Sequence, residues 1–436
     1  MTSDIDIPPA ECADRAVLAA HQEERLTRLL NNVYGRSAFY TRKLDEAGIR
    51  IHALRLPADL ATLPVTTKAE LVADQDEHPP WGTVFTEPIA RYTRYNQTSS
   101  TTGKPLRWLD TNESWQVMLE CWKAVFRAAR VGPADRIFFA FSFGPFLGFW
   151  TAFDAACQLG AHSVPGGGMS SQHRLALIDD LRATVVCCTP TYALRLAEVA
   201  AELRPGGRPA SANSVRTLIV AGEPGGSIPA TRERIEQAWK ARVIDHHGLT
   251  EVGPISFECW EGPGFLHLNE NEFFCEVLNP SGLDPVRDGQ PGELVVTNFN
   301  RTASPVVRYR TGDIVVRSLA PCPCGRTLAR IEGGILARAY DMVNVRGVNV
   351  YPTAIESVTR RFPEIAEFRS TVSRAGAIRS LSIEIELVRG VEDGSTVVAE
   401  LSRRLREALS LTVPIKVVEA GALPRFEMKA RRFVVE

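Results

Sequence analysis

From residue 137 to residue 245 the chain alternates short apolar runs with longer amphipathic segments. The apolar runs predict strands at 137–143, 184–188, 216–221 and 242–245. The amphipathic segments predict helices at 145–160, 172–181, 192–203 and 229–240. Alternation at this spacing favours right-handed crossovers and a mostly parallel sheet covered by helices. Ligands of such sheets bind beyond the carboxyl ends of the strands, so the residues that follow each strand are candidates for a site.

The texture of the chain changes near residue 339. At 436 residues the chain is too long for one ordinary core. After residue 339 the pattern predicts several short strands and two helices, at 353–361 and 396–409. We therefore expect an α/β protein with a large domain over residues 1–338, which adds an exposed β element to its parallel sheet. A small α+β domain is expected over residues 339–436.

Charge and cysteine content exclude several classes of protein. The 50 basic and 51 acidic residues are well mixed, which argues against a nucleic-acid partner or a polybasic membrane-surface protein. Residues 137–153 carry no charge, but Gly144-Pro145 divides them into a strand and a helix start, so a buried core is favoured over a membrane span. We identify no signal peptide. Nine scattered cysteines do not form a disulfide framework, and they fit a reducing cytoplasm.

A run of hydroxyl residues before the predicted strand at 106–109 is the first candidate site. It reads Thr98-Ser99-Ser100-Thr101-Thr102-Gly103-Lys104-Pro105. Hydroxyls and backbone N–H groups can surround the oxygens of a phosphate chain, Gly103 permits a tight backbone, and Lys104 adds a charge. The spacing is not that of a Walker A loop. The alternative is a solvated turn before the strand.

Two further motifs follow predicted strands. Gly222-Glu223-Pro224 comes after the strand at 216–221, and His246-His247-Gly248-Leu249-Thr250-Glu251 comes after the strand at 242–245. Glu251 is a carboxylate at a strand end, where it is suited to hold Mg²⁺ against phosphates. The alternative role for Glu251 is an ordinary surface charge.

Four metal-ligand side chains suggest a zinc site. Cys322 and Cys324 form a tight Cys-x-Cys knuckle, while Cys259 and His267 flank a Gly-Pro-Gly turn as on two arms of a hairpin. Three thiolates and one imidazole make a closed tetrahedral Zn²⁺ site. Because no coordination position stays open, the metal would be structural. The alternative is a set of free thiols.

Six motifs in a fixed order resemble the phenylacetate–CoA ligase branch of the adenylate-forming enzymes, the superfamily of acyl-CoA synthetases, adenylation domains and luciferases. They are the phosphate loop, Gly222-Glu-Pro, His247-Gly-Leu-Thr-Glu251, Arg308-Tyr-Arg-Thr-Gly-Asp313, Arg338…Asp341-Met…Arg346-Gly-Val-Asn-Val-Tyr-Pro352 and Pro424-Arg…Lys429-Ala-x-Arg432. The resemblance implies a small mobile C-terminal domain that carries a catalytic lysine. It also implies ATP-dependent activation of a carboxylic acid as an acyl-adenylate, followed by thioester formation with coenzyme A.

The resemblance assigns roles to individual residues. It places the loop from Thr98 to Lys104 on the ATP phosphates, with Thr250 on the α-phosphate and Glu251 on Mg²⁺. Asp313 would accept hydrogen bonds from the ribose hydroxyls, and Arg338 would reach the nucleotide from the domain junction. The adenine would be lined by Gly222, Glu223, Pro224, His246, His247 and Gly248. His247 replaces the tyrosine that is usual in the family, and an imidazole can also stack on a base.

Lys429 is the expected catalytic residue. Joining a carboxylate to the α-phosphate of ATP brings two anions together, and a fixed ammonium stabilises the crowded, charged transition state. The alternative is an ordinary basic tail, because Arg425, Arg431 and Arg432 lie nearby. Two glycines of the family pattern are also replaced, by Ser100 and Met428.

The substrate, the acceptor and the assembly stay open at this point. Phe141, Phe143 and Phe146 follow a predicted strand and could form a flat pocket for an aromatic acid, or they could belong to the core. The acceptor could be coenzyme A, a carrier-protein phosphopantetheine or an amine. A non-catalytic nucleotide-binding regulator is the alternative of another class, and the retention of Glu251, Asp313 and Lys429 argues against it. A homodimer is also compatible with the sequence.

Overall fold

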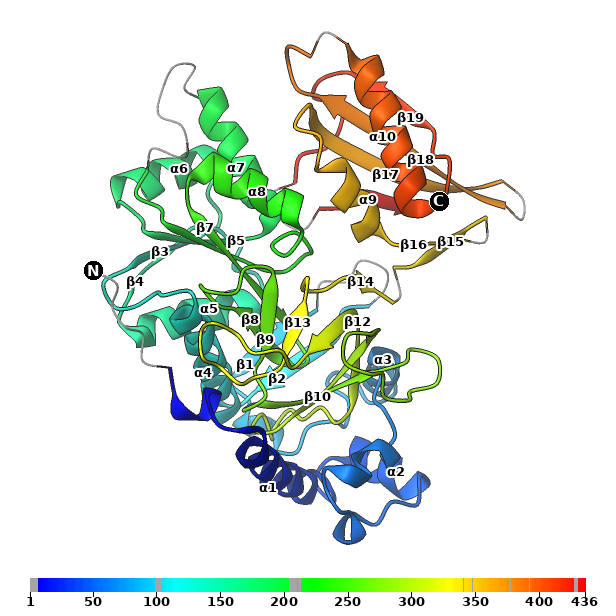
Figure 1. Cartoon of the computed structure of the whole chain (residues 1–436). Helices are drawn as coiled ribbons and strands as arrows, with labels where there is room; N and C mark the ends of the chain where they lie inside the picture. The colour runs from blue at the N-terminus through cyan, green and yellow to red at the C-terminus, as the bar shows by residue number, and fades with distance from the viewer. Residues whose placement is uncertain are drawn as a thin grey trace.

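The computed structural model describes residues 7–98, 104–203, 210, 213–339, 341–346, 348–375, 378–391, 393–426 and 430–436. A large N-terminal domain runs from blue to yellow in Figure 1, and a smaller C-terminal domain, in orange and red, lies at its top. Among the described helices, none combines the length and apolar character needed to cross a membrane.

The strands expected from the alternating pattern form the parallel half of a 12-stranded sheet. Neighbouring strands run in the order β4-β3-β5-β6-β7, and all four pairs are parallel. These strands are β3 (Arg136–Phe139), β4 (His162–Pro165), β5 (Val185–Cys188), β6 (Thr217–Val220) and β7 (Arg242–Leu249). This half confirms the predicted crossovers; β4 was not expected.

Helices cover both faces of the parallel half. Because side chains alternate along a strand, Ile137 and Phe139 of β3 face one core while Phe138 faces the other. The first core is completed by α4 (Asn112–Ala128) and α5 (Leu147–Leu159). The second is completed by α6 (Ser171–Asp180), α7 (Pro190–Leu203) and α8 (Pro229–Trp239).

The other half of the sheet is antiparallel, so the sheet is mixed rather than mostly parallel. From β7 the order continues β8-β9-β13-β12-β11-β10, with β14 paired to β12. These strands are β8 (Gly253–Glu258), β9 (Phe265–Leu268), β10 (Phe273–Leu278), β11 (Pro291–Asn298), β12 (Tyr309–Ser318), β13 (Arg330–Glu332) and β14 (Ala337–Arg338). The turn from Leu249 to Gly253 is too short for a crossover helix, so β8 has to return antiparallel to β7.

The N-terminal segments pack against the antiparallel half. The helices are α1 (Arg15–Val33), α2 (Ala38–Glu46) and α3 (Lys68–Glu77), and a short pair of strands, β1 (Arg94–Gln97) and β2 (Arg107–Asp110), leads into α4. Thr67 caps α3 in a capping box with Glu70, as a threonine at this position favours. Leu26, Leu30 and Val33 of α1 join the core beneath β11 and β12.

The C-terminal domain has its own sheet and core. Its four-stranded sheet has the order β19-β18-β17-β20, and a separate hairpin joins β15 to β16. The elements are β15 (Val343–Val345), β16 (Val348–Val350), α9 (Pro352–Thr359), β17 (Ile365–Ala375), β18 (Ile378–Leu387), α10 (Gly394–Leu409), β19 (Ile415–Val418) and β20 (Phe433–Val435). Strand β20, which was not predicted, lies parallel to β17.

Candidate active site

Three of the predicted site residues meet where β7, β12 and β14 come together. His247 lies on β7, Asp313 on β12, and Arg338 on β14, directly opposite Asp313 in the strand register. The His247 Nε2 atom lies 3.0 Å from Asp313 Oδ2, and Arg338 Nε donates to Asp313 Oδ1 at 3.0 Å. One buried carboxylate therefore binds an imidazole and a guanidinium, one on each of its oxygens.

The environment keeps Asp313 ionised. Burial alone would raise the pKa of its carboxyl, since only 1% of the residue is exposed. The hydrogen bond to His247 and the positive charge of Arg338 outweigh burial and lower the pKa below its ordinary value. The pKa of Arg338 is raised in turn, mainly by the charge of Asp313. Asp313 is therefore a fixed negative acceptor in the middle of β12.

The two neighbouring histidines point to opposite faces of β7. While His247 reaches Asp313, His246 is buried against the ring of Trp122 on α4, with ring centroids 4.4 Å apart. Its Nδ1 atom lies 2.8 Å from the carbonyl oxygen of Ser256. Burial lowers the pKa of His246 to about 4. Of the two candidates for nucleotide contact, His247 is the one on the side of Asp313.

Glu251 and Thr250 are held by residues from distant parts of the chain. The Glu251 carboxylate accepts from the Tyr309 hydroxyl at 3.1 Å, and the Lys68 ammonium lies 3.6 Å from the same oxygen. The carbonyl oxygen of Thr250 accepts from Arg301 at 2.8 Å. Glu251 is 3% exposed, so its carboxylate group lies inside the protein beside the Lys68 ammonium.

Only the two ends of the hydroxyl-rich loop are described. Residues 99–103, which include Ser99, Ser100, Thr101, Thr102 and Gly103, lie outside the described residues. Thr98 is buried, and its hydroxyl oxygen accepts from the Leu106 amide at 3.0 Å, so the ends of the loop are tied together. Lys104 is exposed and forms an ion pair with Asp76 at 2.9 Å. The described residues on the two sides of this segment, Thr98 and Leu106, are therefore hydrogen-bonded to each other.

Glu223 follows strand β6 and bridges the two domains. Its Oε1 atom accepts from the backbone amide of Thr191 at 2.9 Å, and its Oε2 atom accepts from the amide of Ala430 at 2.7 Å. On either side of Glu223, Gly222 has a positive φ of 94° and Pro224 is exposed. Lys429 itself lies outside the described residues, but the segment that follows it is attached to the N-terminal domain through Glu223.

The predicted aromatic pocket residues cluster after β3. Phe141 stacks on Phe149 at 4.0 Å between ring centroids, and Phe146 meets Phe149 edge-on at 5.8 Å. Phe143 lies 5.0 Å from Trp150. The cluster adjoins the start of the hydroxyl-rich loop, because the amide of Gln97 donates to the carbonyl oxygen of Pro145 at 2.8 Å. Apolar rings and the loop are therefore neighbours, as a pocket for an aromatic acid would require.

The four predicted metal ligands converge beneath the antiparallel strands. Cys259 follows β8, His267 lies on β9, and Cys322 and Cys324 lie between β12 and β13; their ligand atoms all lie within 4.8 Å of one another. The sulfurs of Cys259 and Cys322 are 3.6 Å apart, and the Cys324 sulfur is 3.5 Å from His267 Nε2. A Cβ added at Gly262 would lie 3.3 Å from two of the sulfurs, so a glycine keeps this cradle open.

Several residues near the site were not expected from the sequence. Lys68 begins helix α3, and Tyr309 lies inside a recognised motif without an assigned role. Arg301 and Thr191 lie outside all the motifs. Their contacts join segments far apart in the chain, and the local sequence pattern does not indicate such contacts.

The comparisons with known sequences agree with the order of the motifs. A family profile described as AMP-binding enzyme matches residues 43–302, and one described as AMP-binding enzyme C-terminal domain matches residues 347–436. A phenylacetate-coenzyme A ligase of Thermus thermophilus is 33% identical over 449 residues, which cover 98% of each chain. The phenylacetate-coenzyme A ligase of Escherichia coli K12 is 33% identical over 99% of this chain and 98% of its own.

The structure is also similar to crystal structures of 2-hydroxyisobutyryl-CoA ligase. In its postadenylation state with R3-HIB-AMP, that enzyme matches with a TM-score of 0.93 at 27% identity, over 98% of this chain and 92% of its own. In its thioesterification state with 2-HIB-AMP and CoA, the same coverage gives a TM-score of 0.75. The chain belongs to the AMP-binding, adenylate-forming enzyme family, in its phenylacetate–CoA ligase-like branch.

Proposed function

We propose that this protein uses ATP to convert a carboxylic acid to an acyl-adenylate and then transfers the acyl group to coenzyme A. The observation that carries the proposal is the cluster of His247, Asp313 and Arg338, with Glu251 nearby, in a chain 33% identical to phenylacetate–CoA ligases over nearly its full length. The acid is proposed to be aromatic, because the phenylalanine cluster adjoins the hydroxyl-rich loop.

The residues divide the work between two domains, which we place at residues 1–338 and 339–436. Asp313 would accept hydrogen bonds from the ribose hydroxyls. His247, Gly248 and the segment from Gly222 to Pro224 would lie against the adenine. The loop from Thr98 to Lys104 and the Thr250 hydroxyl would bind the phosphates. Arg338 would reach the nucleotide from the end of the large domain.

Lys429 would supply the charge that the first step needs. An acid carboxylate attacks the α-phosphorus of ATP, and pyrophosphate leaves. A positioned ammonium stabilises the extra negative charge on the crowded phosphorus centre. In the second step, the thiolate of coenzyme A attacks the acyl carbon and AMP leaves.

Glu251 is the residue that would hold Mg²⁺. The Tyr309 hydroxyl and the Lys68 ammonium both contact its Oε1 atom. A nearly buried carboxylate suits a hard divalent cation. The ion would neutralise negative charge on the phosphates of ATP. Glu251 and Lys68 would hold in place the part of the site where the ion binds.

The test is acid-dependent pyrophosphate release across a panel that includes phenylacetate, benzoates, 2-hydroxyisobutyrate and straight-chain acids. We expect release with at least one aromatic acid, and an acyl-CoA product when free coenzyme A is added. A pantetheinylated carrier protein or an amine that is acylated in place of coenzyme A would change the acceptor and leave the first step standing. No release with any acid would favour a non-catalytic nucleotide-binding regulator.

We also propose a structural zinc ion at Cys259, His267, Cys322 and Cys324. Sulfur atoms at about 2.3 Å from a tetrahedral Zn²⁺ lie about 3.8 Å apart, and the sulfurs of Cys259 and Cys322 are separated by 3.6 Å. The three thiols and one imidazole match the donors that zinc prefers, and they leave no open position for chemistry. The ion would tie the β8–β9 hairpin to the loop before β13.

Metal analysis of the purified chain tests this site. We expect about one zinc per chain, and we expect Cys324→Ser to lower both zinc content and melting temperature, because a structural metal contributes folding free energy. The matched control is Cys275→Ser, at a cysteine outside the cluster. A purified chain that contains no zinc and still has full stability would refute the proposal.

The remaining parts of the proposal concern the cellular compartment and the oligomeric state. The scattered cysteines are all unpaired among the described residues, which supports a reducing cytoplasm. Whether the chain acts as a homodimer is decided by its molar mass in solution.

A further inference from the structure

The carboxylate of Glu223 links the N-terminal domain to the segment that carries Lys429. On one side it accepts the amide of Thr191, near the start of α7, where backbone N–H groups have no partner within the helix. On the other side it accepts the amide of Ala430, which follows Lys429 in the chain. Both partners are backbone amides, so the bridge fixes main-chain positions rather than side chains.

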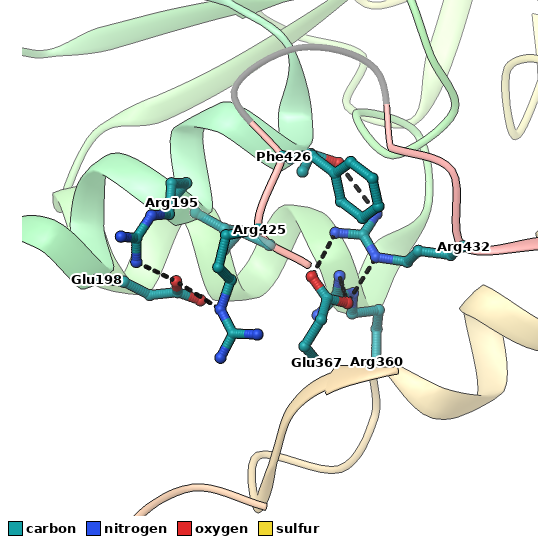
Figure 2. A pocket seen from close by; sticks show the side chains of 9 residues that line it. Arg195, Glu198, Arg360, Glu367, Arg425, Phe426 and Arg432 are labelled. Atoms are coloured by element: carbon teal, nitrogen blue, oxygen red, sulfur yellow. Dashed lines mark hydrogen bonds and ion pairs between the residues drawn. The ribbon is translucent and has the colours of Figure 1, made fainter. Parts of the chain in front are cut away.

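A second contact crosses the junction two residues further on. Arg432 binds Glu367 of β17 through two hydrogen bonds, of 2.7 and 2.9 Å, and its Nη1 atom donates to the Thr191 hydroxyl at 3.1 Å. Figure 2 shows Arg432 and Arg360 converging on Glu367, beside the helix that carries Arg195 and Glu198. Thr191 therefore faces Glu223 with its amide and Arg432 with its hydroxyl.

We propose that Glu223 is a positioning residue that clamps the backbone at Ala430 onto α7 and so presents Lys429 to the adenylation site. This inference rests on the proposed function, in which Lys429 serves the first step. It adds a role for the Glu223 side chain that contact with the adenine does not supply.

The charge of Glu223 suits a clamp better than a neutral side chain would. A carboxylate accepts with both oxygens, and hydrogen bonds to a charged acceptor are stronger than those to a neutral one. A glutamine of the same shape keeps one acceptor and turns an NH₂ group toward the other amide, where two donors oppose each other. Glu223→Gln therefore preserves the volume while it breaks one arm of the clamp.

The clamp also favours one arrangement of the domains. Rotation of the C-terminal domain away from α7 would break the bonds from Ala430 to Glu223 and from Arg432 to Thr191 together. In the proposed mechanism Lys429 serves the first step, so transfer to coenzyme A, the second step, does not need the clamp. The two half-reactions should therefore respond differently to its loss.

The experiment compares the parent enzyme, Glu223→Gln and the control Glu236→Gln. Glu236 also accepts a backbone amide, that of Val243 at 3.0 Å, but both residues lie in the N-terminal domain. Three quantities are measured: pyrophosphate exchange with its kcat and KM for ATP, transfer from a synthetic acyl-adenylate to coenzyme A, and amide hydrogen exchange over residues 430–432. The acid is whichever one supports exchange best in the parent.

We expect Glu223→Gln to lower kcat for pyrophosphate exchange about tenfold or more, the effect of roughly one charged hydrogen bond, with KM for ATP within about twofold. Transfer from the acyl-adenylate should proceed at the parent rate or faster, and amide exchange at 430–432 should accelerate. Glu236→Gln should change none of these.

Two results would overturn the clamp. An increase in KM for ATP with equal loss in both half-reactions would make Glu223 a nucleotide contact only. Unchanged amide exchange at 430–432 in Glu223→Gln would show that the bridge does not hold this segment. A parent enzyme without exchange on any acid refutes the proposed function instead, and the amide-exchange measurement still decides on the clamp.

Discussion

Polar contacts hold two regions of this molecule in opposite ways. Inside the N-terminal domain, Arg301 forms a bidentate pair with Asp110, with distances of 2.7 and 2.6 Å, and neither side chain is exposed. At the junction, Arg425 lies 3.7 Å from Glu198, and their side chains are 26% and 37% exposed. Other junction contacts are hydrogen bonds of 3.3 Å from Arg234 to the carbonyl oxygen of Ile365.

The difference follows from what each region has to do. The Asp110–Arg301 pair sits beneath Thr250 and keeps the Thr250–Glu251 segment in one place, so a dry, two-pronged contact is suitable. The exposed Arg425–Glu198 ion pair can be replaced by water when the two residues separate, so it costs little to break. The pair that fixes the Thr250–Glu251 segment is buried, whereas this junction pair is exposed to solvent.

Replacing Asp110 by asparagine should cause the largest loss of stability, and it is the most direct test of this comparison. The change leaves the Arg301 guanidinium buried without its counter-charge, so we expect a loss of about 3–5 kcal/mol in the free energy of unfolding. Urea denaturation measures it. At the junction, Glu198→Gln should cost less than about 1 kcal/mol. Similar losses in the two variants would mean that burial does not distinguish the regions.

A double replacement controls for variants that fail to fold. With both Asp110 and Arg301 changed to leucine, no unpaired charge stays in the core, and much of the stability should return. Pyrophosphate exchange by this double variant should still be impaired, because the Thr250 carbonyl has lost its donor.

Removal of the Lys429 charge tests the part of the comparison that concerns the junction between the domains. Lys429→Ala should lower acid-dependent pyrophosphate exchange by roughly 10²-fold or more, by analogy with the loss of one transition-state donor. Transfer of the acyl group from a preformed acyl-adenylate should change far less. The unfolding free energy should stay at the parent value. Equal damage to both half-reactions would assign Lys429 a structural role.

A smaller loss of stability than that of Asp110→Asn is expected from protonation of His246, which is also buried, and this loss depends on pH. Burial lowers the pKa of His246 to about 4 in the folded protein, whereas the unfolded chain takes up a proton below about 6.5. Stability from neutral His246 is therefore complete above this value and is lost as the pH falls toward 4. Between pH 7 and pH 5 we expect a loss of about 2 kcal/mol from this residue. Urea denaturation of His246→Gln at both pH values should show a shallower pH dependence; an unchanged slope would contradict the prediction.

The sequence predicted the parts of the fold that are repeated or local. The four strands that gave the alternating pattern lie in the parallel half, and the helices that follow them begin and end within a few residues of the predicted ranges. The Thr67 cap of α3 is likewise local, because a capping box needs only residues three positions apart. The proposed zinc ligands could be paired because two short spacings, Cys-x-Cys and a hairpin, each bring two of them together.

Long-range register could not be predicted in this way. Strand β14 has only two residues, yet its pairing with β12 places Arg338 opposite Asp313. Nothing in residues 337–338 specifies that partner, because strand pairing is decided by packing against the rest of the sheet. Lys68 reaches Glu251 for the same reason: the contact depends on how α3 docks on the antiparallel half.

Strand β20 has a consequence for the segment between Phe426 and Ala430. On one side, Arg425 binds Glu386 of β18, at 3.0 Å through its Nη1 atom. On the other, the carbonyl oxygen of Arg432 accepts from the Ser370 amide at 2.7 Å, and β20 continues the pairing with β17. The chain is therefore anchored on both sides of residues 427–429, which lie outside the described residues. A segment anchored at both ends has far fewer conformations to lose than a free tail, so we expect that bringing the Lys429 ammonium to a substrate demands correspondingly little entropy.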